Sequence, residues 1–299
     1  MNHAKLQGVF PALLTPMAAD ETINLPALRA QVDRLIGAGV HGLFILGTNS
    51  EFYALSYEEK TAIARVVVEQ CNGRVPVCAG TGCVSTRDTI ELSRTVSRIG
   101  VDAIAVVTPY YVSVSEDELC AHYRDVAMSV SLPVLLYNIP ARAGNSISAR
   151  AVASLSQIEH IVGIKDTSGD FNNTLAYIEA AGPEFSVFAG NDSLILWTLL
   201  AGGAGGISGL ANVVPEVIVA LYERWKAGDM VGAARAQNAI RPLRACLRMG
   251  NPNSIIKRAA NLAGQSVGPA RRPASGADER IDAEISAALA SLMHDSSTA

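Results

Sequence analysis

The sequence predicts an α/β protein, a (β/α)8 TIM barrel with a small C-terminal helical domain. Three observations predict this fold: eight short apolar runs, amphipathic segments between them, and the loss of strand signal after residue 228. The runs are apolar at successive residues, which is typical of parallel strands covered on both faces. Eight strand–helix units favour a closed barrel, and an open doubly wound sheet is the alternative because periodicity does not show closure.

The eight expected strands are short β-branched or apolar runs bounded by residues that favour turns. They cover residues 8–16, 42–48, 76–82, 103–109, 134–140, 161–167, 186–192 and 205–210. Three of the segments that follow them begin with a serine and an acidic residue three positions later, at Ser56, Ser85 and Ser115. This spacing predicts a capping box, in which the hydroxyl accepts from an early backbone N–H and the carboxylate accepts from the serine N–H.

The C-terminal part of the chain shows helical periodicity only. It predicts helices over residues 230–248, 252–263 and 277–293. We therefore expect two domains, a catalytic barrel at residues 1–228 and a helical domain at residues 229–299. The apolar faces of the helical domain are expected either to contact another subunit or to cover the barrel.

The composition excludes several classes of protein. Of the 299 residues 49% are hydrophobic and 17% are charged, which excludes disorder as the main state. The net charge of -4 argues against nucleic acid or an anionic membrane as the main partner. Residues 1–8 lack the apolar core of a secretory signal, and the five cysteines show no paired spacing. We expect a reduced, cytoplasmic protein.

One uncharged segment is long enough to span a bilayer. It lies between Asp192 and Glu216, and five glycines interrupt it. We expect a buried strand and helix there, and no membrane partner, because the glycines break a continuous helix.

No metal or dinucleotide cofactor is expected. The five histidines show neither an HExxH motif nor clustered spacing, so a catalytic metal is not predicted. The glycines at 80 and 82 lack the third glycine of a dinucleotide fingerprint, because Ser85 takes its place. The glycines at 202–206 fit tight helix–strand packing better than a phosphate-binding loop.

Lys165 is the residue that points most directly to chemistry. In parallel barrels the reactive groups lie at the C-terminal ends of the strands, and Lys165 ends the sixth apolar run. The other four lysines lie in tail or helix segments with charged or exposed neighbours. Apolar surroundings favour the neutral amine, which attacks a ketone to form a Schiff base. The alternative is a structural lysine paired with a carboxylate such as Asp166.

Other polar side chains follow neighbouring strands. Tyr137 ends the fifth run, and its phenol is expected to carry protons to and from the Lys165 amine, unless it is an interior tyrosine bonded to a backbone carbonyl. Thr48 and Tyr111 either extend this relay or have structural roles. Arg142, on the loop after the fifth run, is either a carboxylate clamp or an ordinary solvated arginine.

These positions together resemble the dihydrodipicolinate synthase / N-acetylneuraminate lyase family of pyruvate-dependent class I aldolases. The motifs that carry the resemblance are GTNSE at 47–51, VTPYY at 107–111, YNIPAR at 137–142, GIKD at 163–166 and AGND at 189–192. They occur in the family's order and spacing, and the likeness runs from residue 8 to about residue 263. The resemblance implies a barrel with a helical domain, in a homotetramer or dimer.

The resemblance also implies roles for the site residues. Lys165 forms the Schiff base with pyruvate or a 2-keto acid, with no other cofactor. Tyr137, Thr48 and Tyr111 form the proton relay, and Tyr111 reaches a neighbouring subunit. The substrate-binding residues implied are Asn49, Arg142, Gly190, Asp192 and Ile207, with Asn49 holding the keto-acid carboxylate.

The substrate is open at this stage, because the motifs depart from the family's pattern at two positions. Arg142 matches the synthase branch, which condenses pyruvate with an aldehyde to form 4-hydroxy-tetrahydrodipicolinate, and this reaction is preferred. Asn49 and Ser50 depart from the usual loop, and Asp192 matches the lyase branch. They favour retro-aldol cleavage or dehydration of a 2-keto-3-deoxy sugar acid or 4-hydroxy-2-oxoglutarate. A barrel that binds keto acids without catalysis is a third alternative.

Overall fold

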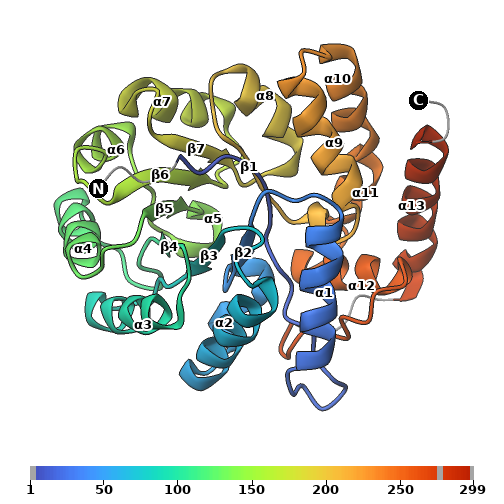
Figure 1. Ribbon diagram of the computed structural model, residues 1–299, viewed down its shortest axis with the longest axis horizontal. Coiled ribbons are helices and arrows are strands. Elements are labelled where there is room, and N and C mark those ends of the chain that lie inside the picture. The colour runs from blue at the N-terminus through green and yellow to red at the C-terminus, as the bar shows by residue number, and fades with distance from the viewer. Residues whose placement is uncertain (1–4, 275–278, 297–299) are drawn as a thin grey trace.

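The structure, a computed structural model, describes residues 5–274 and 279–296 and has eight strands at its centre (Figure 1). All eight lie within the runs that the sequence predicts. They are β1 (Gly8–Pro11), β2 (Leu43–Ile45), β3 (Val77–Gly80), β4 (Ala103–Val107), β5 (Val134–Asn138), β6 (Ile161–Asp166), β7 (Ser186–Ala189) and β8 (Gly205–Ser208). The expectation of no signal peptide concerned residues 1–8, of which residues 1–4 lie outside the described part.

The strands form a parallel barrel, as predicted. Their order is β1-β8-β7-β6-β5-β4-β3-β2, and every pair in this order is parallel. The two ends of the order meet at a parallel bridge between Ala12 and Phe44, where the Leu13 N–H donates to the Phe44 carbonyl at 2.8 Å. This contact closes the sheet and excludes the open doubly wound alternative.

Helices surround the strands (Figure 1). In the barrel they are α1 (Leu25–Gly37), α2 (Tyr57–Cys71), α3 (Thr86–Ile99), α4 (Glu116–Met128), α5 (Pro140–Ala143), α6 (Ala149–Leu155), α7 (Phe171–Ala181), α8 (Ile195–Leu200) and α9 (Pro215–Lys226). Single 3-10 turns occur at Thr48–Ser50, Phe52–Ala54, Asp192–Leu194 and Leu210–Asn212. The first and third of these turns lie directly after β2 and β7, at the edge where the barrel opens.

Two of the three predicted capping boxes form. Ser56 pairs with Glu59 and Ser115 with Glu118, each in both directions. Ser85 accepts from the Asp88 N–H, but Asp88 does not return a bond to the Ser85 backbone. Aspartate is one methylene shorter than glutamate, and the full box requires that reach.

Apolar side chains fill the barrel and the layer outside it. The interior cluster includes Phe10, Phe44 and Phe188, and a larger cluster packs the outer faces of the strands against the helices. Buried strand residues on both sides explain the continuous apolar runs in the sequence. Tyr137 belongs to the interior cluster, which places it at the edge between the apolar interior and the polar barrel mouth.

The C-terminal helices pack against one side of the barrel (Figure 1). They are α10 (Met230–Ala239), α11 (Arg241–Cys246), α12 (Pro252–Leu262) and, after a 3-10 turn at Glu279–Ile281, α13 (Asp282–Ser296). The single helix predicted over 230–248 is wrong, because the chain divides at Ile240 into α10 and α11. Pro242, in the first turn of α11, lacks the N–H that a continuous helix would bond to the preceding turn. The helix predicted over 277–293 begins partly outside the described residues. The domain division at residue 228 stays a prediction.

The uncharged segment after Asp192 folds as expected into a short helix and a buried strand, but the helix exposes Trp197 and Leu200 on its outer side. It contains α8, β8 and the turn at Leu210–Asn212. Within residues 5–274 and 279–296, no helix is long and apolar enough to cross a membrane.

Candidate active site

A pocket opens at the mouth of the barrel, where the predicted chemistry was expected. Its volume is about 230 Å³, which is below the range of about 300–1,000 Å³ for sites that bind drug-sized ligands, so it suits a small substrate. Eight of the nine predicted site residues line it: Thr48, Asn49, Tyr137, Arg142, Lys165, Gly190, Asp192 and Ile207. These side chains follow β2, β5, β6, β7 and β8, so the parallel topology brings distant segments of the chain to one place.

Lys165 lies in apolar surroundings inside this pocket. It is 4% exposed, and its register partner on β5 is Tyr137. The Lys165 Nζ lies 4.3 Å from the centroid of the Phe44 ring and 4.2 Å from that of the Tyr137 ring. Among the described residues, no carboxylate lies within 4.0 Å of this nitrogen. The amine is therefore held by aromatic faces and is open toward the cavity.

The neighbouring carboxylate of Asp166 points away from Lys165. It accepts from the Asn138 amide at 3.1 Å, the Ser168 hydroxyl at 2.9 Å and the Thr174 hydroxyl at 2.8 Å. Successive residues of a strand face opposite sides, so Lys165 enters the barrel while Asp166 fixes the loop and helix outside it. This arrangement removes the structural pairing of Lys165 with Asp166 that the sequence left open.

Tyr137 and Thr48 form a pair of hydroxyls beside the amine. The Tyr137 oxygen lies 3.1 Å from the Thr48 Oγ1, within hydrogen-bond distance. The Tyr137 ring packs edge-to-face against Phe44 at 6.1 Å between centroids, which fixes its orientation. Because the phenol bonds to a side-chain hydroxyl, the alternative in which it is satisfied by a backbone carbonyl does not apply.

The loop after β2 is held by a buried network. The Ser50 hydroxyl donates to the Leu13 carbonyl at 2.5 Å, and the Ser50 carbonyl accepts from the Thr15 hydroxyl at 2.8 Å. Ser50 is thus a structural residue that does not line the pocket, whereas Asn49 does. Of the two departures from the family's loop pattern, only Asn49 directly changes the pocket wall.

A buried ion pair joins this loop to helix α12. The Lys257 Nζ lies 2.5 Å from the Glu51 carboxylate, and both side chains are at most 1% exposed. Burial lowers the pKa of Lys257, and the Glu51 charge opposes this shift. Lys257 lies on a helix beside a charged residue, as expected, but its side chain is buried, which the sequence did not indicate. The Asn253 amide also donates to the Thr48 carbonyl at 2.8 Å.

Among the residues that the structure describes, Asp192 is the one acidic side chain in the pocket wall. It is 5% exposed, and it accepts from the Ser208 hydroxyl and, at 3.4 Å, from the Leu210 N–H. Burial raises the pKa of Asp192. Gly190 precedes it by two residues, and a Cβ there would lie 2.0 Å from the Thr167 Oγ1, so glycine is required for this close approach.

Two predicted residues lie nearer the solvent. Arg142 is exposed on α5 and lines the pocket from the rim. Tyr111 is 95% exposed, has a φ of 77° in the left-handed region, and does not line the pocket of its own chain. The relay role of Tyr111 depends on a second subunit and stays a prediction.

The structure adds residues that sequence reasoning missed. The additional polar residues in the wall are Thr167, Asn191, Arg244 and Asn253. Asn191 lies inside the AGND motif and had a signal. Arg244 and Asn253 had none, because only the packing of α11 and α12 over the barrel mouth shows their contribution.

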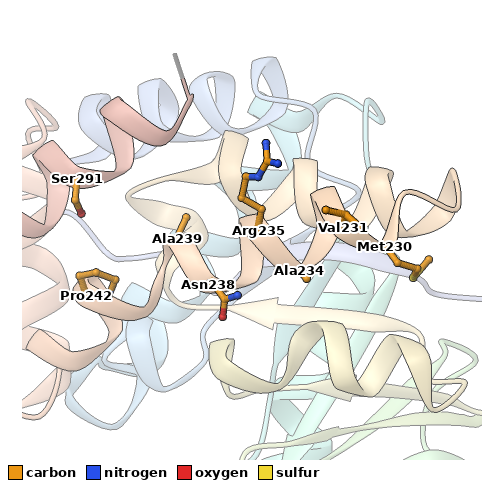
Figure 2. A pocket seen from close by; sticks show the side chains of 8 residues that line it. All are labelled: Met230, Val231, Ala234, Arg235, Asn238, Ala239, Pro242 and Ser291. Atoms are coloured by element: carbon orange, nitrogen blue, oxygen red, sulfur yellow. The ribbon is translucent and has the colours of Figure 1, made fainter. Parts of the chain in front are cut away.

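A second hollow of about 650 Å³ lies on the C-terminal helices (Figure 2). Its wall includes Met230, Val231 and Arg235 of α10, Pro242 of α11 and Ser291 of α13, and it shares no residue with the barrel-mouth pocket. It lacks a lysine and a buried carboxylate, so the chemistry is assigned to the barrel mouth. In the part of the chain that the structure describes, no three His, Cys, Asp or Glu side chains gather as a metal site.

Comparison with known proteins identifies the family. A model of the dihydrodipicolinate synthetase family matches residues 5–292. The chain belongs to this family. The match covers nearly the whole chain and extends past residue 263 into α13, so the C-terminal helices belong to the family's pattern as well. Members of the family are lyases and aldolases, and this chain is therefore an enzyme of the lyase class.

Two members of the dihydrodipicolinate synthetase family show how close the likeness is. The 4-hydroxy-tetrahydrodipicolinate synthase of Methanopyrus kandleri is 40% identical over 277 residues, 92% of each chain. The crystal structure of YagE from Escherichia coli K12, in complex with pyruvate, is 38% identical with a TM-score of 0.94 and covers 97% of this chain and 99% of its own. The assignment of YagE as a 2-dehydro-3-deoxy-D-gluconate aldolase is provisional.

Proposed function

We propose that the chain is a metal-independent class I aldolase whose Lys165 amine forms a Schiff base with pyruvate or a related 2-keto acid. The observation that carries this proposal is the buried Lys165 Nζ, held by two aromatic rings without a carboxylate partner, beside the Tyr137–Thr48 hydroxyl pair. A neutral amine is the nucleophile that attacks a ketone, and a hydroxyl pair supplies and removes protons. Pyruvate bound to YagE supports the substrate class.

The reaction follows from these groups. The Lys165 nitrogen adds to the keto carbon of pyruvate, and the carbinolamine loses water to form an iminium ion. The iminium loses a proton from its methyl group and becomes an enamine. The enamine carbon attacks the aldehyde carbon of the second substrate, whose oxygen takes a proton through Tyr137. Water then hydrolyses the new iminium, which releases the product and restores the free amine.

The remaining predicted residues have binding roles in this proposal. The loop with Thr48 and Asn49 holds the keto-acid carboxylate, and Ile207 and Gly190 shape the wall beside it. Arg142 at the rim holds the carboxylate of the aldehyde, because a guanidinium binds a carboxylate through two parallel hydrogen bonds. Condensation of pyruvate with aspartate semialdehyde is accordingly the preferred reaction, and the likeness to the 4-hydroxy-tetrahydrodipicolinate synthase of Methanopyrus kandleri supports the synthase branch.

We further propose a cytoplasmic homo-oligomer, a tetramer or a dimer, with no nucleic-acid or membrane partner. Tyr111 is fully exposed and strained at a positive φ, as expected for a residue that completes a neighbouring subunit's relay. Loss of activity in Tyr111→Ala, with recovery in mixed oligomers that combine it with Lys165→Ala chains, tests this arrangement. No recovery in the mixed oligomers contradicts it.

A second candidate reaction is favoured by Asp192. A buried carboxylate bonded to Ser208 in the pocket wall provides an acceptor for substrate hydroxyls. This feature supports retro-aldol cleavage or dehydration of a 2-keto-3-deoxy sugar acid or 4-hydroxy-2-oxoglutarate, and the likeness to YagE agrees with it.

A substrate panel decides between these reactions. Wild type, Lys165→Ala and Arg142→Ala are assayed for condensation of pyruvate with aldehydes and for cleavage of 2-keto-3-deoxy acids, with exposed Arg124→Ala as the matched control. Lys165→Ala is expected to lose all turnover, and retained turnover refutes the proposal. Binding of keto acids by wild type without any turnover supports a non-catalytic barrel. Unchanged condensation with aspartate semialdehyde in Arg142→Ala contradicts the preference for the synthase reaction.

A further inference from the structure

A second arginine enters the active-site pocket from the C-terminal domain. Arg244 lies in the last turn of α11 and lines the same cavity as Lys165 and Arg142. Its Nη2 donates to the Asn191 Oδ1 at 3.3 Å, and its Nε is buried without a hydrogen-bond partner. A guanidinium has five N–H donors, so most of the capacity of Arg244 is available to a ligand.

The guanidinium groups in the cavity outnumber the carboxylates. Among the described residues, two arginines, Arg142 and Arg244, and one carboxylate, Asp192, line it beside the Lys165 amine. No carboxylate among the described residues lies within 4.0 Å of Arg244. Asp192 directs its oxygens to Ser208 and the Leu210 N–H. The Arg244 charge acts on Asp192 and opposes the rise of its pKa by burial, so the two groups interact at a distance without a direct ion pair. A partly buried guanidinium without a direct ion pair is costly, and an anionic ligand that binds it removes this cost.

A further donor lines the same wall. The Thr167 hydroxyl is buried without a hydrogen-bond partner, close to Gly190. Thr167 directly follows β6 and lies two residues after Lys165. Buried polar groups in native proteins are normally satisfied, by a ligand where no protein group serves. Two unpartnered donors in one cavity indicate a polar ligand that extends from the Lys165 amine toward α11.

We propose that Arg244, together with Asn191, forms a subsite for the distal carboxylate of the longer keto acid, the one that condensation forms or cleavage consumes. The inference rests on the proposed function, since it assumes that the keto end of this acid lies at Lys165, and it defines the class of the longer acid as 2-keto diacids. A carboxylate suits this position because one planar guanidinium matches its two oxygens. Phosphate sites commonly use helix N-termini, whereas Arg244 lies at the C-terminal end of α11.

The test uses two ligands that differ only at the distal end. Binding of 2-oxoadipate and 2-oxohexanoate, which have the same six-carbon chain, is measured by calorimetry on the full-length protein. Wild type is expected to bind the diacid roughly 10- to 100-fold more tightly, because a charge-assisted pair contributes about that factor. Arg244→Gln is expected to reduce this ratio to below about threefold. Arg241→Gln, an exposed arginine on the same helix, is the matched control and keeps the wild-type ratio.

Each outcome bears on the proposal. Equal affinities of wild type for the two acids, or a preference that survives in Arg244→Gln, overturn it. A preference that disappears only in Arg142→Gln assigns the carboxylate to the rim arginine and also overturns it. Pyruvate-dependent labelling of Lys165 by borohydride tests the proposed function separately. A preference for the diacid without labelling supports the Arg244 subsite and refutes the aldolase. Labelling without a preference for the diacid supports the aldolase and refutes the subsite.

Discussion

Tyr137→Phe removes one hydroxyl from the barrel mouth and leaves the aromatic ring in place. The ring contacts Phe44 and the Lys165 Nζ, so the substitution keeps these apolar contacts. It removes the hydrogen bond of 3.1 Å to Thr48, which contributes about 1 kcal/mol to the free energy of unfolding. Proton transfer by a positioned side chain contributes about 10²- to 10⁴-fold to a rate. We therefore expect a large loss of kcat with a small loss of stability.

The assay measures kcat and KM for the best substrate of the panel, together with unfolding in urea. Tyr110→Phe is the matched control, because Tyr110 lines an adjoining hollow of about 220 Å³ and contacts Phe52 outside the proposed relay. Tyr137→Phe is expected to lose at least a hundredfold in kcat, whereas Tyr110→Phe changes it by less than about threefold. A loss below tenfold in Tyr137→Phe refutes the role of the phenol in proton transfer.

The relay also predicts how two substitutions combine. Thr48→Val removes the partner hydroxyl without changing the size of the side chain. If Thr48 and Tyr137 act as one relay, the double variant loses little more than Tyr137→Phe alone, within about threefold, because residues that act as a unit are not additive. Losses in kcat that multiply fully contradict a shared relay and indicate separate roles.

Two further predictions concern the buried charged residues beside the pocket. Glu51→Gln leaves the Lys257 charge buried without its partner and is expected to lower the free energy of unfolding in urea by about 3–5 kcal/mol. Glu69→Gln, at the exposed Arg29 pair, is the control and is expected to lower it by less than about 1 kcal/mol, and equal losses contradict a role for burial. Burial raises the pKa of Asp192, so the folded state binds this proton more tightly than the unfolded chain does, and stability from this group falls as pH rises through the folded pKa. Asp192→Asn is therefore expected to gain stability relative to wild type as pH rises above the ordinary aspartate pKa of about 4. A difference in unfolding free energy between the two proteins that does not change with pH contradicts this.

The barrel was predictable because each element carries a local signal. Strands covered on both faces are continuous apolar runs in the sequence, and all eight strands lie within the predicted runs. Serine residues with an acidic residue three positions later mark the starts of three helices. The break between α10 and α11 also had a signal, Pro242, which the helical periodicity on both sides of it obscured.

Site residues could be predicted only where they lie at or just after the C-terminal end of a strand. Lys165, Tyr137 and Asp192 follow strands, and parallel topology brings such ends together. Arg244, Asn253 and the Lys257–Glu51 pair depend on the packing of the C-terminal helices over the mouth, and this packing leaves no periodic signal in the sequence. The exposed position of Tyr111 likewise depends on a surface that one chain does not complete.

Reductive trapping tests whether the Lys165 amine forms a Schiff base with pyruvate. The protein is incubated with pyruvate and sodium borohydride, digested, and analysed by mass spectrometry, with Lys165→Ala as the control. We predict a pyruvate-dependent mass increase on the peptide that contains Lys165 in wild type, and no adduct in the variant. An absence of adduct at saturating pyruvate, or an adduct on another lysine such as Lys257, contradicts the account.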